Sequence, residues 1–318
     1  KVHMDFVGKR FWFFIISSLV IVPGIIFLIS APGLRPGIDF TGGSSMTIQF
    51  PGETSINQKE LRESLSALGH PEATVQKMGS AIFFVRTKEL DEISKDSLVS
   101  GLVNSFAPSS DPQLLLQGFD LVSPVVAQET VINAFWAVLA AAVGIYLYLW
   151  WAFRNVPSPF RYGTAAIIAL VHDTMVVIGI FAILGKLLDI EVNTMFLIAL
   201  LTVIGYSVND TIVVFDRLRE NVLLYPTRSL VVNANQSISE SLGRSLNTSL
   251  TLLFTLLALL LFGGPTIQVF LWVLLIGVVA GTYSSIGVAT NVLVAWESGD
   301  LGRFFRRFRS TAPAQAPK

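Results

Sequence analysis

The chain has 318 residues, of which 52% are hydrophobic and only 14% are charged, and its 22 basic residues balance 22 acidic ones. Soluble domains usually carry about 25% charged residues, so this composition predicts a protein embedded in a lipid bilayer. The sequence has no basic face and no nucleic-acid-binding motif, so nucleic acid is not an expected partner. The chain has no cysteine and only three scattered histidines, which excludes disulfides, iron–sulfur clusters and thiol catalysis and leads us to expect no cofactor and no metal site.

Six runs are apolar over the roughly 20 residues that a helix needs to cross about 30 Å of hydrocarbon. The sequence predicts transmembrane helices at residues 11–30, 131–153, 162–184, 194–215, 245–262 and 269–296. Residues 1–10 precede them, residues 216–244 form a cytoplasmic loop, and residues 297–318 form a basic, partly disordered tail. The first run has the basic start of a cleaved signal peptide, but it is long for one and Pro23 interrupts it, so we expect an uncleaved span.

Residues 31–128 are mixed and polar, and they are long enough for a small domain. Strands are predicted at SSMTIQF (44–50), ATVQKMG (73–79), AIFFVRT (81–87) and QLLLQGFDLV (113–122), with a hairpin at Gly79–Ser80. Helical periodicity marks NQKELRESLSAL (57–68) and ISKDSLVSGLVNSF (93–106). The order βαββαβ predicts an α+β ferredoxin-like fold, and because this fold hosts many functions we expect no more of it than a docking or binding surface.

Lysine and arginine residues near the ends of the spans predict the orientation. One side of the membrane collects Lys1, Lys9, Arg10, Arg154, Arg161, Arg217, Arg219, Arg228, Arg244, Arg303, Arg306, Arg307 and Arg309. The short hairpins on the other side contain only Lys186. Since positive charge is retained in the cytoplasm, we expect both termini inside the cell and residues 31–128 outside the membrane.

The third and fourth predicted spans both carry a carboxylate. Counted from Arg161, the pair His172–Asp173 lies about 16–18 Å deep, and Asp210, counted from Arg217, lies about 10 Å from the cytoplasmic interface. A carboxylate at the centre of a membrane helix costs ~2.5–3.5 kcal/mol on insertion scales, which makes such residues functional-site hypotheses.

Polar residues accompany Asp210 along its helix. Thr202, Tyr206 and Asn209 or Asp210 follow helical spacing, which predicts one polar stripe. In the sixth span Gly277 and Gly281 form a GxxxG pattern, which is typical of a helix-packing face.

Arg244 stands at the start of the fifth predicted span, and helical spacing places it on one face with Thr248, Thr251 and Thr255. Arg244 and Asp210 both fall in the inner half of the membrane, so they can pair. If the arginine approaches and withdraws, the carboxylate can take a proton from one side and release it to the other. Each proton that falls through the membrane potential supplies about 2.3 kcal/mol per 100 mV.

A structural role is the alternative for each of these residues. Arg244 can extend to the lipid headgroups, and Asp173 and His172 can be hydrogen-bonded packing residues. Asn209 and the threonines can serve helix packing. For Asp210, a deep carboxylate on a polar stripe, we favour a functional role.

Several stretches resemble the SecF family of bacterial protein-export subunits. GIDFTGG, which contains Gly37, Asp39, Gly42 and Gly43, is similar to the family's signature after the first span. LVHDT (170–174), VIGYSVNDTIVVFDRLREN (203–221) and SISESLGRSLNTS (237–249) are similar to family stretches in spans three and four and before span five. The resemblance extends from about residue 6 to residue 309.

The resemblance implies a subunit of the bacterial inner membrane that is related to the RND exporters. The implied partners are SecD, the SecYEG channel, accessory subunits such as YajC and YidC, and a translocating preprotein. The implied activity is the use of a proton or sodium gradient to assist late translocation, with Asp210 and Arg244 in ion coupling and an outer domain that moves. The stretch VSPVVAQE departs from the family pattern, with Ser123 and Ala127 where glycines are common, which puts the freedom of this linker in question.

Two other functions remain open at the level of sequence. An RND-type exporter of small molecules or lipids needs a substrate cleft, for which one outer domain of this size offers little room. A passive scaffold has little use for Asp210. We expect no enzyme, because the sequence contains no nucleophile–base pattern, phosphate-binding loop or metal-ligand spacing.

Overall fold

The computed structural model describes residues 5–30, 33–50, 56–78, 81–107, 116–264 and 267–299. The predicted hairpin at Gly79–Ser80 and the basic tail lie outside this part of the chain. Two compact units are present, a smaller one of residues 34–137 and 184–197 and a larger one of residues 1–33, 138–183 and 198–318. The connection between the third and fourth membrane helices therefore belongs to the same unit as the outer domain.

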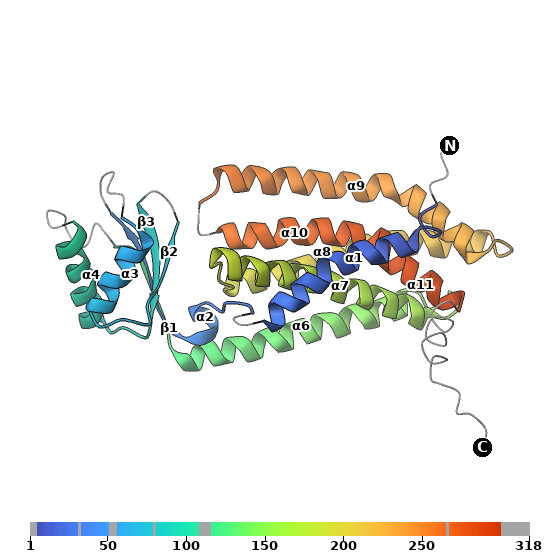
Figure 1. The fold of residues 1–318 in the computed structure, drawn as a ribbon. Coiled ribbons are helices and arrows are strands. Elements are labelled where there is room, and N and C mark those ends of the chain that lie inside the picture. The colour runs from blue at the N-terminus through green and yellow to red at the C-terminus, as the bar shows by residue number, and fades with distance from the viewer. Residues whose placement is uncertain are drawn as a thin grey trace, which may run out of the picture. The chain divides into compact units, whose positions relative to one another are not determined.

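The smaller unit contains a four-stranded sheet of β1 (Gly43–Gln49), β2 (Thr74–Lys77), β3 (Ile82–Thr87) and β4 (Leu116–Val122). Neighbouring strands are antiparallel and their order is β2-β3-β1-β4. Helix α3 (Gln58–Ala67) connects β1 to β2, helix α4 (Glu92–Phe106) connects β3 to β4, and both lie on one side of the sheet (Figure 1). The predicted ferredoxin-like fold is confirmed.

The core of this domain lies between the sheet and its two helices, because strands direct every second side chain to that face. Its fully buried members include Met46, Leu61, Leu65, Phe83, Val85 and Leu102. Both helices begin at a capped residue. Asn57 forms a capping box with Glu60, and the Asp91 side chain accepts a hydrogen bond from the backbone N–H of Ser94 at 2.9 Å. These caps satisfy amides that the first helical turn leaves unpaired.

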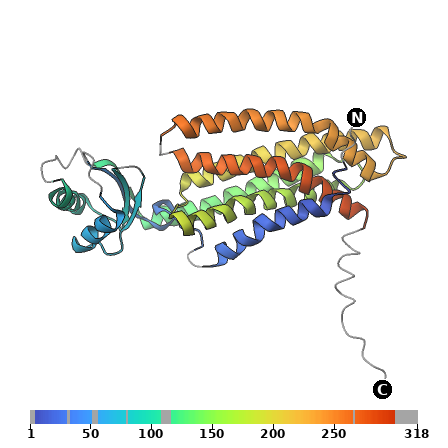
Figure 2. The same cartoon turned by 45° about the horizontal axis from the view of Figure 1, so that its top comes forward.

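Six helices in the described residues are long and apolar enough to cross a membrane, as predicted. They are α1 (Arg10–Ile29), α6 (Pro124–Ala152), α7 (Pro159–Leu188), α8 (Thr194–Leu224), α9 (Leu230–Phe262), and a sixth span in which α10 (Gln268–Ser284), the π-helical turn η2 (Ser285–Ala289) and α11 (Thr290–Glu297) follow one another. In the most apolar 18-residue stretch of each helix, half or more of the residues are buried in α7, α8 and the sixth span, whereas 17% or fewer are buried in α1, α6 and α9. The central helices are therefore α7, α8 and α10, and α9 runs beside α10 (Figures 1 and 2).

Two segments differ from the prediction. Residues 216–244, expected as a loop, are mostly helical, because α8 continues to Leu224 and α9 begins at Leu230 behind its N-cap Ser229. Arg217 of α8 bonds Glu240 of α9 at 2.5 Å, which holds these polar extensions together. The stretch VSPVVAQE, expected as a linker, is the start of α6, because proline suits the first position of a helix.

The predicted GxxxG packing face is confirmed. A Cβ added to Gly277 would lie 2.1 Å from Val203 Cγ2, and one added to Gly281 would lie 2.9 Å from Ser207 Cβ. Both partners belong to α8, so the two missing side chains let α10 approach that helix closely. The contact holds the residues that follow Gly281 next to the middle of α8.

A second close contact joins α1 to α7, where Gly24 and Gly179 meet backbone to backbone. A Cβ on Gly24 would lie 2.7 Å from Gly179 Cα, and no side-chain movement relieves this clash. We expect Gly24→Ala to destabilise the folded chain by roughly 1–3 kcal/mol, the usual cost of overpacking. The midpoint of thermal unfolding in detergent measures the loss. Gly144→Ala is the control, because a Cβ there has nothing within 4 Å, and equal midpoints for the two variants would contradict the expected clash.

Candidate functional site

Asp210 of α8 is buried, with only 5% of its surface exposed. Its Oδ1 accepts a hydrogen bond from the Ser245 hydroxyl at 2.6 Å. Its Oδ2 is also buried, and no residue that the structure describes donates a hydrogen bond to it. Native proteins pair nearly all buried polar atoms, so an unpaired carboxylate oxygen marks a group that can accept a proton or another ligand.

The predicted pair of Arg244 with Asp210 is not formed in this structure. The Arg244 side chain is exposed, and it makes no hydrogen bond or ion pair with the described residues. The direct contact comes instead from Ser245, because one residue along a helix is a rotation of about 100°, which turns Ser245 into the bundle and Arg244 out of it.

The face of α9 that enters the bundle carries small polar residues at four-residue spacing. These buried residues are Asn233, Ser237, Ser241, Ser245 and Ser249. The predicted face of Arg244, Thr248, Thr251 and Thr255 lies beside them on the exposed side of the helix. The serine repeat is visible in the sequence, and it is the signal that the interpretation of this helix missed.

Tyr206 and Asp210 lie one turn apart on α8, and both contact α9. The Tyr206 hydroxyl is 2.9 Å from Ser249 Oγ, which in turn is 2.6 Å from Thr282 Oγ1 on α10. These two members of the predicted polar stripe therefore both face α9. Asn209, which directly precedes Asp210 in the sequence, is exposed.

A polar surface faces outward from α8 and α9. On α8 it contains Thr202, Gly205 and Asn209, and on α9 it contains Arg244, Asn247, Thr248, Thr251 and Thr255, all of them exposed. Of the predicted stripe, Thr202 and Asn209 are exposed, whereas Tyr206 is half-buried and Asp210 is buried. We call the exposed set on the two helices the outward polar face. Hydrocarbon is a poor environment for such groups, so another protein is the better neighbour for it.

The second carboxylate, Asp173 of α7, is 1% exposed and fully hydrogen-bonded. Its Oδ2 accepts hydrogen bonds from the hydroxyls of Ser207 on α8 and Ser284 on α10, the latter at 2.6 Å. Its Oδ1 is 2.9 Å from His172 Nδ1. Asp173 thus joins three helices, and the sequence did not single out Ser207.

His172 extends this network toward α1. Its Nε2 is 2.9 Å from Ser17 Oγ, and Ser17 Oγ is 3.3 Å from the Tyr283 hydroxyl. The Tyr283 hydroxyl donates to the carbonyl oxygen of Phe13 at 2.5 Å. Ser17 and Tyr283 are additional members of the centre, and nothing in their local sequence marks them.

The π-helical turn lies next to the Asp173 centre. Ser285, its first residue, is 2.9 Å from Thr211 Oγ1 on α8, and its carbonyl oxygen accepts from Thr290 Oγ1 at 3.1 Å. Single π-helical turns occur frequently at functional sites. Here the turn places consecutive serines against two positions of α8, since Ser284 and Ser285 bond to Asp173 and Thr211 respectively.

Helix α8 connects the two carboxylate centres. Ser207 donates to Asp173, and Asp210, three residues further along, accepts from Ser245. A rotation or axial shift of α8 therefore changes the hydrogen bonds of both centres together. The signature residues Gly37, Asp39, Gly42 and Gly43 belong to the smaller unit, whereas both carboxylates belong to the larger one.

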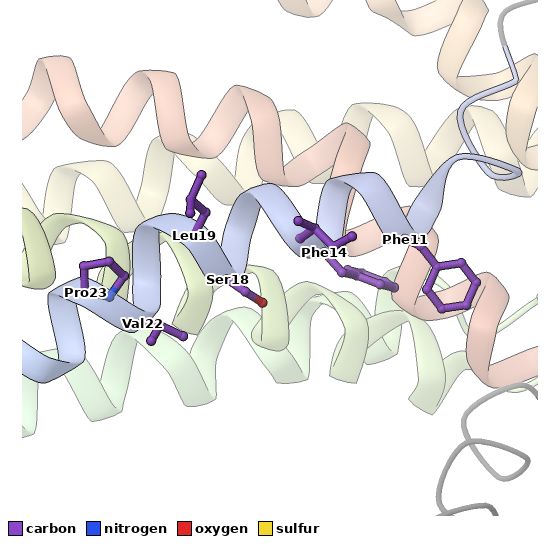
Figure 3. Close-up of a pocket in the computed structure, with 7 residues that line it drawn as sticks. Phe11, Phe14, Ser18, Leu19, Val22 and Pro23 are labelled. Carbon is purple, nitrogen blue, oxygen red and sulfur yellow. The ribbon is translucent and has the colours of Figure 1, made fainter.

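A hollow of about 500 Å³ runs along α1, and its walls are almost entirely apolar. Figure 3 shows its lining by Phe11, Phe14, Ser18, Leu19, Val22 and Pro23. It contains none of the candidate charged residues. Lipid acyl chains fit such a surface, so we place the chemistry at the two carboxylate centres and not here.

Two family models match the chain. Residues 103–299 match the C-terminal region of the protein export membrane proteins SecD and SecF, and residues 27–50 match the SecD/SecF GG motif. The first match contains Asp173, Asp210 and their partners on α7 to α10, though not Ser17 of α1, and the second contains the signature residues.

Curated relatives match almost from end to end. The protein translocase subunit SecF of Thermobaculum terrenum is 44% identical, with 98% of this chain and 99% of the relative covered. The subunit of the same name from Anaerolinea thermophila is 41% identical, with 98% of this chain and 100% of the relative covered.

Two solved structures of SecDF are also similar. The chain superimposes on SecDF of Thermus thermophilus, described as a translocon-associated membrane protein, with a TM-score of 0.77 and 32% identity over 93% of this chain. It superimposes on a SecDF structure in a super-membrane-facing form with a TM-score of 0.65 and 30% identity over 96% of this chain. It spans only 39% and 40% of those longer chains.

Proposed function

Since the chain belongs to the SecD/SecF family of protein-export membrane proteins, with SecF subunits as its full-length relatives, we propose that it uses the proton or sodium motive force to assist late-stage translocation through the SecYEG channel. A role in protein export and a multi-pass location in the inner membrane follow from the family and the six helices. The ion coupling, the channel and the orientation, with both termini cytoplasmic and residues 31–128 outside, belong to the proposal.

The observation that supports ion coupling best is the unequal state of the two oxygens of Asp210. Oδ1 is held by Ser245, and the buried Oδ2 has no partner among the described residues. A proton on Oδ2 neutralises the carboxylate and removes its attraction for Arg244. Loss of that proton restores the attraction, because opposite charges in a medium of low dielectric interact strongly.

The hydrogen bonds of α8 can convert this change of charge into movement. When Asp210 is charged, Arg244 draws α9 and α8 together, and when it is neutral only the Ser245 contact remains. Ser207 and Tyr206 lie on the same helix, so a shift of α8 also alters the bonds to Asp173 and Ser249. Each proton supplies about 2.3 kcal/mol per 100 mV, which exceeds the roughly 0.5–1.5 kcal/mol of a typical net hydrogen bond.

The outward polar face is the surface that we assign to SecD. The SecD/SecF family model and the SecDF structures support this partner. A transmembrane partner that covers Asn209 and the α9 threonines also lies beside Arg244 and can change its distance from Asp210. Contacts with YajC, YidC and the preprotein remain part of the proposal on the strength of family resemblance alone.

Replacing two threonines of this face tests the assignment. We expect Thr248→Leu/Thr251→Leu to reduce the amount of SecD that copurifies at least fivefold, because the bulkier side chains prevent close helix packing. The control is Thr130→Leu on α6, whose hydroxyl likewise bonds its own helix at the carbonyl of Val126. Unchanged recovery of SecD with the double variant would show that SecD binds elsewhere.

The proposed coupling is tested by export into sealed membrane vesicles that contain the wild-type complex. A proton gradient and a sodium gradient are imposed separately, and the late step is followed as protection of an exported preprotein from added protease. We expect one of the two gradients to stimulate export. If neither gradient has an effect, the subunit assists export without ion coupling.

A further inference from the structure

The signature segment, residues 37–43, and Pro36 before it contact the starts of two membrane helices, α6 and α8, and the connection between α7 and α8, all within the smaller unit. Pro36 forms a parallel bridge with Val192, which lies in the connection from α7 to α8, and the backbone N–H of Gly37 donates to the Val192 carbonyl at 2.7 Å. The first residue of α6, Pro124, lies next to Gly42. One short segment therefore reaches the connection between α7 and α8 and the starts of α6 and α8.

Asp39 caps α8 from outside that helix. Its Oδ2 accepts a hydrogen bond from the backbone N–H of Thr194, the first residue of α8, at 2.7 Å. Asn193 accepts from the N–H of Phe196 at 3.1 Å, so the local cap and the distant one share the first turn. A carboxylate here also lies at the positive end of the helix dipole, which strengthens the contact.

Only a very short stretch of chain separates Asp39 from the sheet. It lies in α2 (Ile38–Thr41), and β1 begins two residues after that turn at Gly43. Gly42 and Gly43 have φ values of +73° and +120°, which side chains rarely allow. A Cβ on Gly43 would lie 2.6 Å from the carbonyl oxygen of Thr87 in β3, and one on Gly42 would lie 3.0 Å from Pro124 Cα. The two glycines thus let the cap, the sheet and α6 meet directly.

Ion pairs also hold the connection between α7 and α8 next to the sheet. Arg86 of β3 donates to the carbonyl of Pro36 at 2.5 Å and pairs with Glu191 at 3.3 Å, and Arg35 pairs with Asp189. Burial raises the pKa of the Glu191 carboxyl, and Arg86 and Arg35 act in the opposite direction. The connection between α7 and α8 is therefore tied to a central strand of the sheet by charge as well as by the backbone bridge.

We propose that the signature segment is a rigid coupling that transmits displacement of α8 to the outer sheet, with Asp39 as its positioning residue. The inference rests on the proposed function, because it supplies the route by which a change at Asp210, sixteen residues along the same helix, moves the outer domain. A rigid coupling differs from a hinge in one testable way. If the segment is a rigid coupling, cross-linking it preserves the transmission of movement from α8 to the sheet, whereas removing its contacts stops that transmission.

The coupling is tested first by removing the cap. We expect Asp39→Ala to lower gradient-stimulated export at least fivefold, whereas Asp39→Asn, whose amide oxygen can accept the same N–H, keeps most of it. Asp91→Ala is the matched control, because Asp91 caps α4 in the same domain and its side chain bonds the backbone N–H of Ser94 in that helix. Equal export by the two alanine variants would overturn the proposal.

An engineered disulfide then tests whether the segment acts as a rigid coupling or as a hinge. The chain has no cysteine, and bridged strands lie about 4.8 Å apart, within the roughly 4.4–6.8 Å that disulfides span between Cα atoms. We expect oxidised Pro36→Cys/Val192→Cys to export normally and to restore export to Asp39→Ala. Loss of export on oxidation, with recovery on reduction, would show that the segment is a hinge.

A second readout needs no ion gradient and so separates this inference from the proposed function. Hydrogen exchange on the full chain with SecD should show faster exchange in Asp39→Ala at both the first turns of α8 and the ends of β1 and β3. Asp91→Ala should quicken exchange in α4 alone. Faster exchange confined to α8 would overturn the coupling, whatever the vesicle experiment gives.

Discussion

Asp210→Asn is expected to abolish the stimulation of export by an ion gradient and to leave the chain folded and inserted. Asparagine keeps the shape of the side chain, and its amide oxygen can still accept from Ser245. It cannot alternate between a charged and a neutral form, so Arg244 no longer experiences a changing attraction. Protease protection of an exported preprotein in vesicles, with and without the gradient, measures the loss.

The matched control for this variant is Asp216→Asn. Asp216 lies on the same helix, but it is exposed and pairs with Arg219 at 3.4 Å. We expect it to retain gradient-stimulated export, because an exposed ion pair contributes little energy. If the ion gradient still stimulated export fully in Asp210→Asn, Asp210 would have no part in ion coupling. Loss in both variants would point to a general effect of charge on this helix.

Asp173→Ala is expected to destabilise the bundle by about 3–5 kcal/mol, the usual cost of breaking a buried charged network by removing one partner. His172, Ser207 and Ser284 would each lose a bond to the carboxylate. The midpoint of thermal unfolding in detergent reports this loss. Ser284→Ala, which removes one hydroxyl, should lower the midpoint by a smaller amount that corresponds to about 1 kcal/mol.

Comparison of the two carboxylates assigns their roles. Asp210→Asn should leave the unfolding midpoint unchanged or raise it, because the native carboxylate already has a buried oxygen without a partner in the described residues. Asp173→Ala should lower it strongly. If Asp173→Ala keeps its stability and loses only gradient stimulation, then Asp173 and His172 belong to the ion path and not to the packing of the bundle.

Hydropathy and periodicity predicted the six helices and the ferredoxin-like domain, because both depend on patterns within one segment. They did not predict that α8 and α9 continue as helices beyond the apolar region. Those extensions are polar, and contacts such as Arg217–Glu240 and the Ser229 cap stabilise them. Hydropathy reports which residues prefer lipid, and it does not report where a helix ends.

The candidate site was predicted only in part, because the sequence shows which residues are costly in lipid but not which side of a helix packs against its neighbours. The sequence identified Asp210 because a deep carboxylate is costly wherever it faces. It could not decide which polar stripe of α9 enters the bundle, since the serine and threonine stripes are both consistent with helical spacing. Only packing against Tyr206 and Asp210 shows that the side with Ser245 and Ser249 faces inward. The π-helical turn has no sequence signal that we could have used.

The outward polar face has a consequence for the stability of this protein in the absence of a partner. A guanidinium, an asparagine amide and several hydroxyls are costly to leave in lipid, and a companion helix removes that cost. If the partner that we propose covers this face, a copy of the chain without that partner is less stable in the membrane than an assembled one.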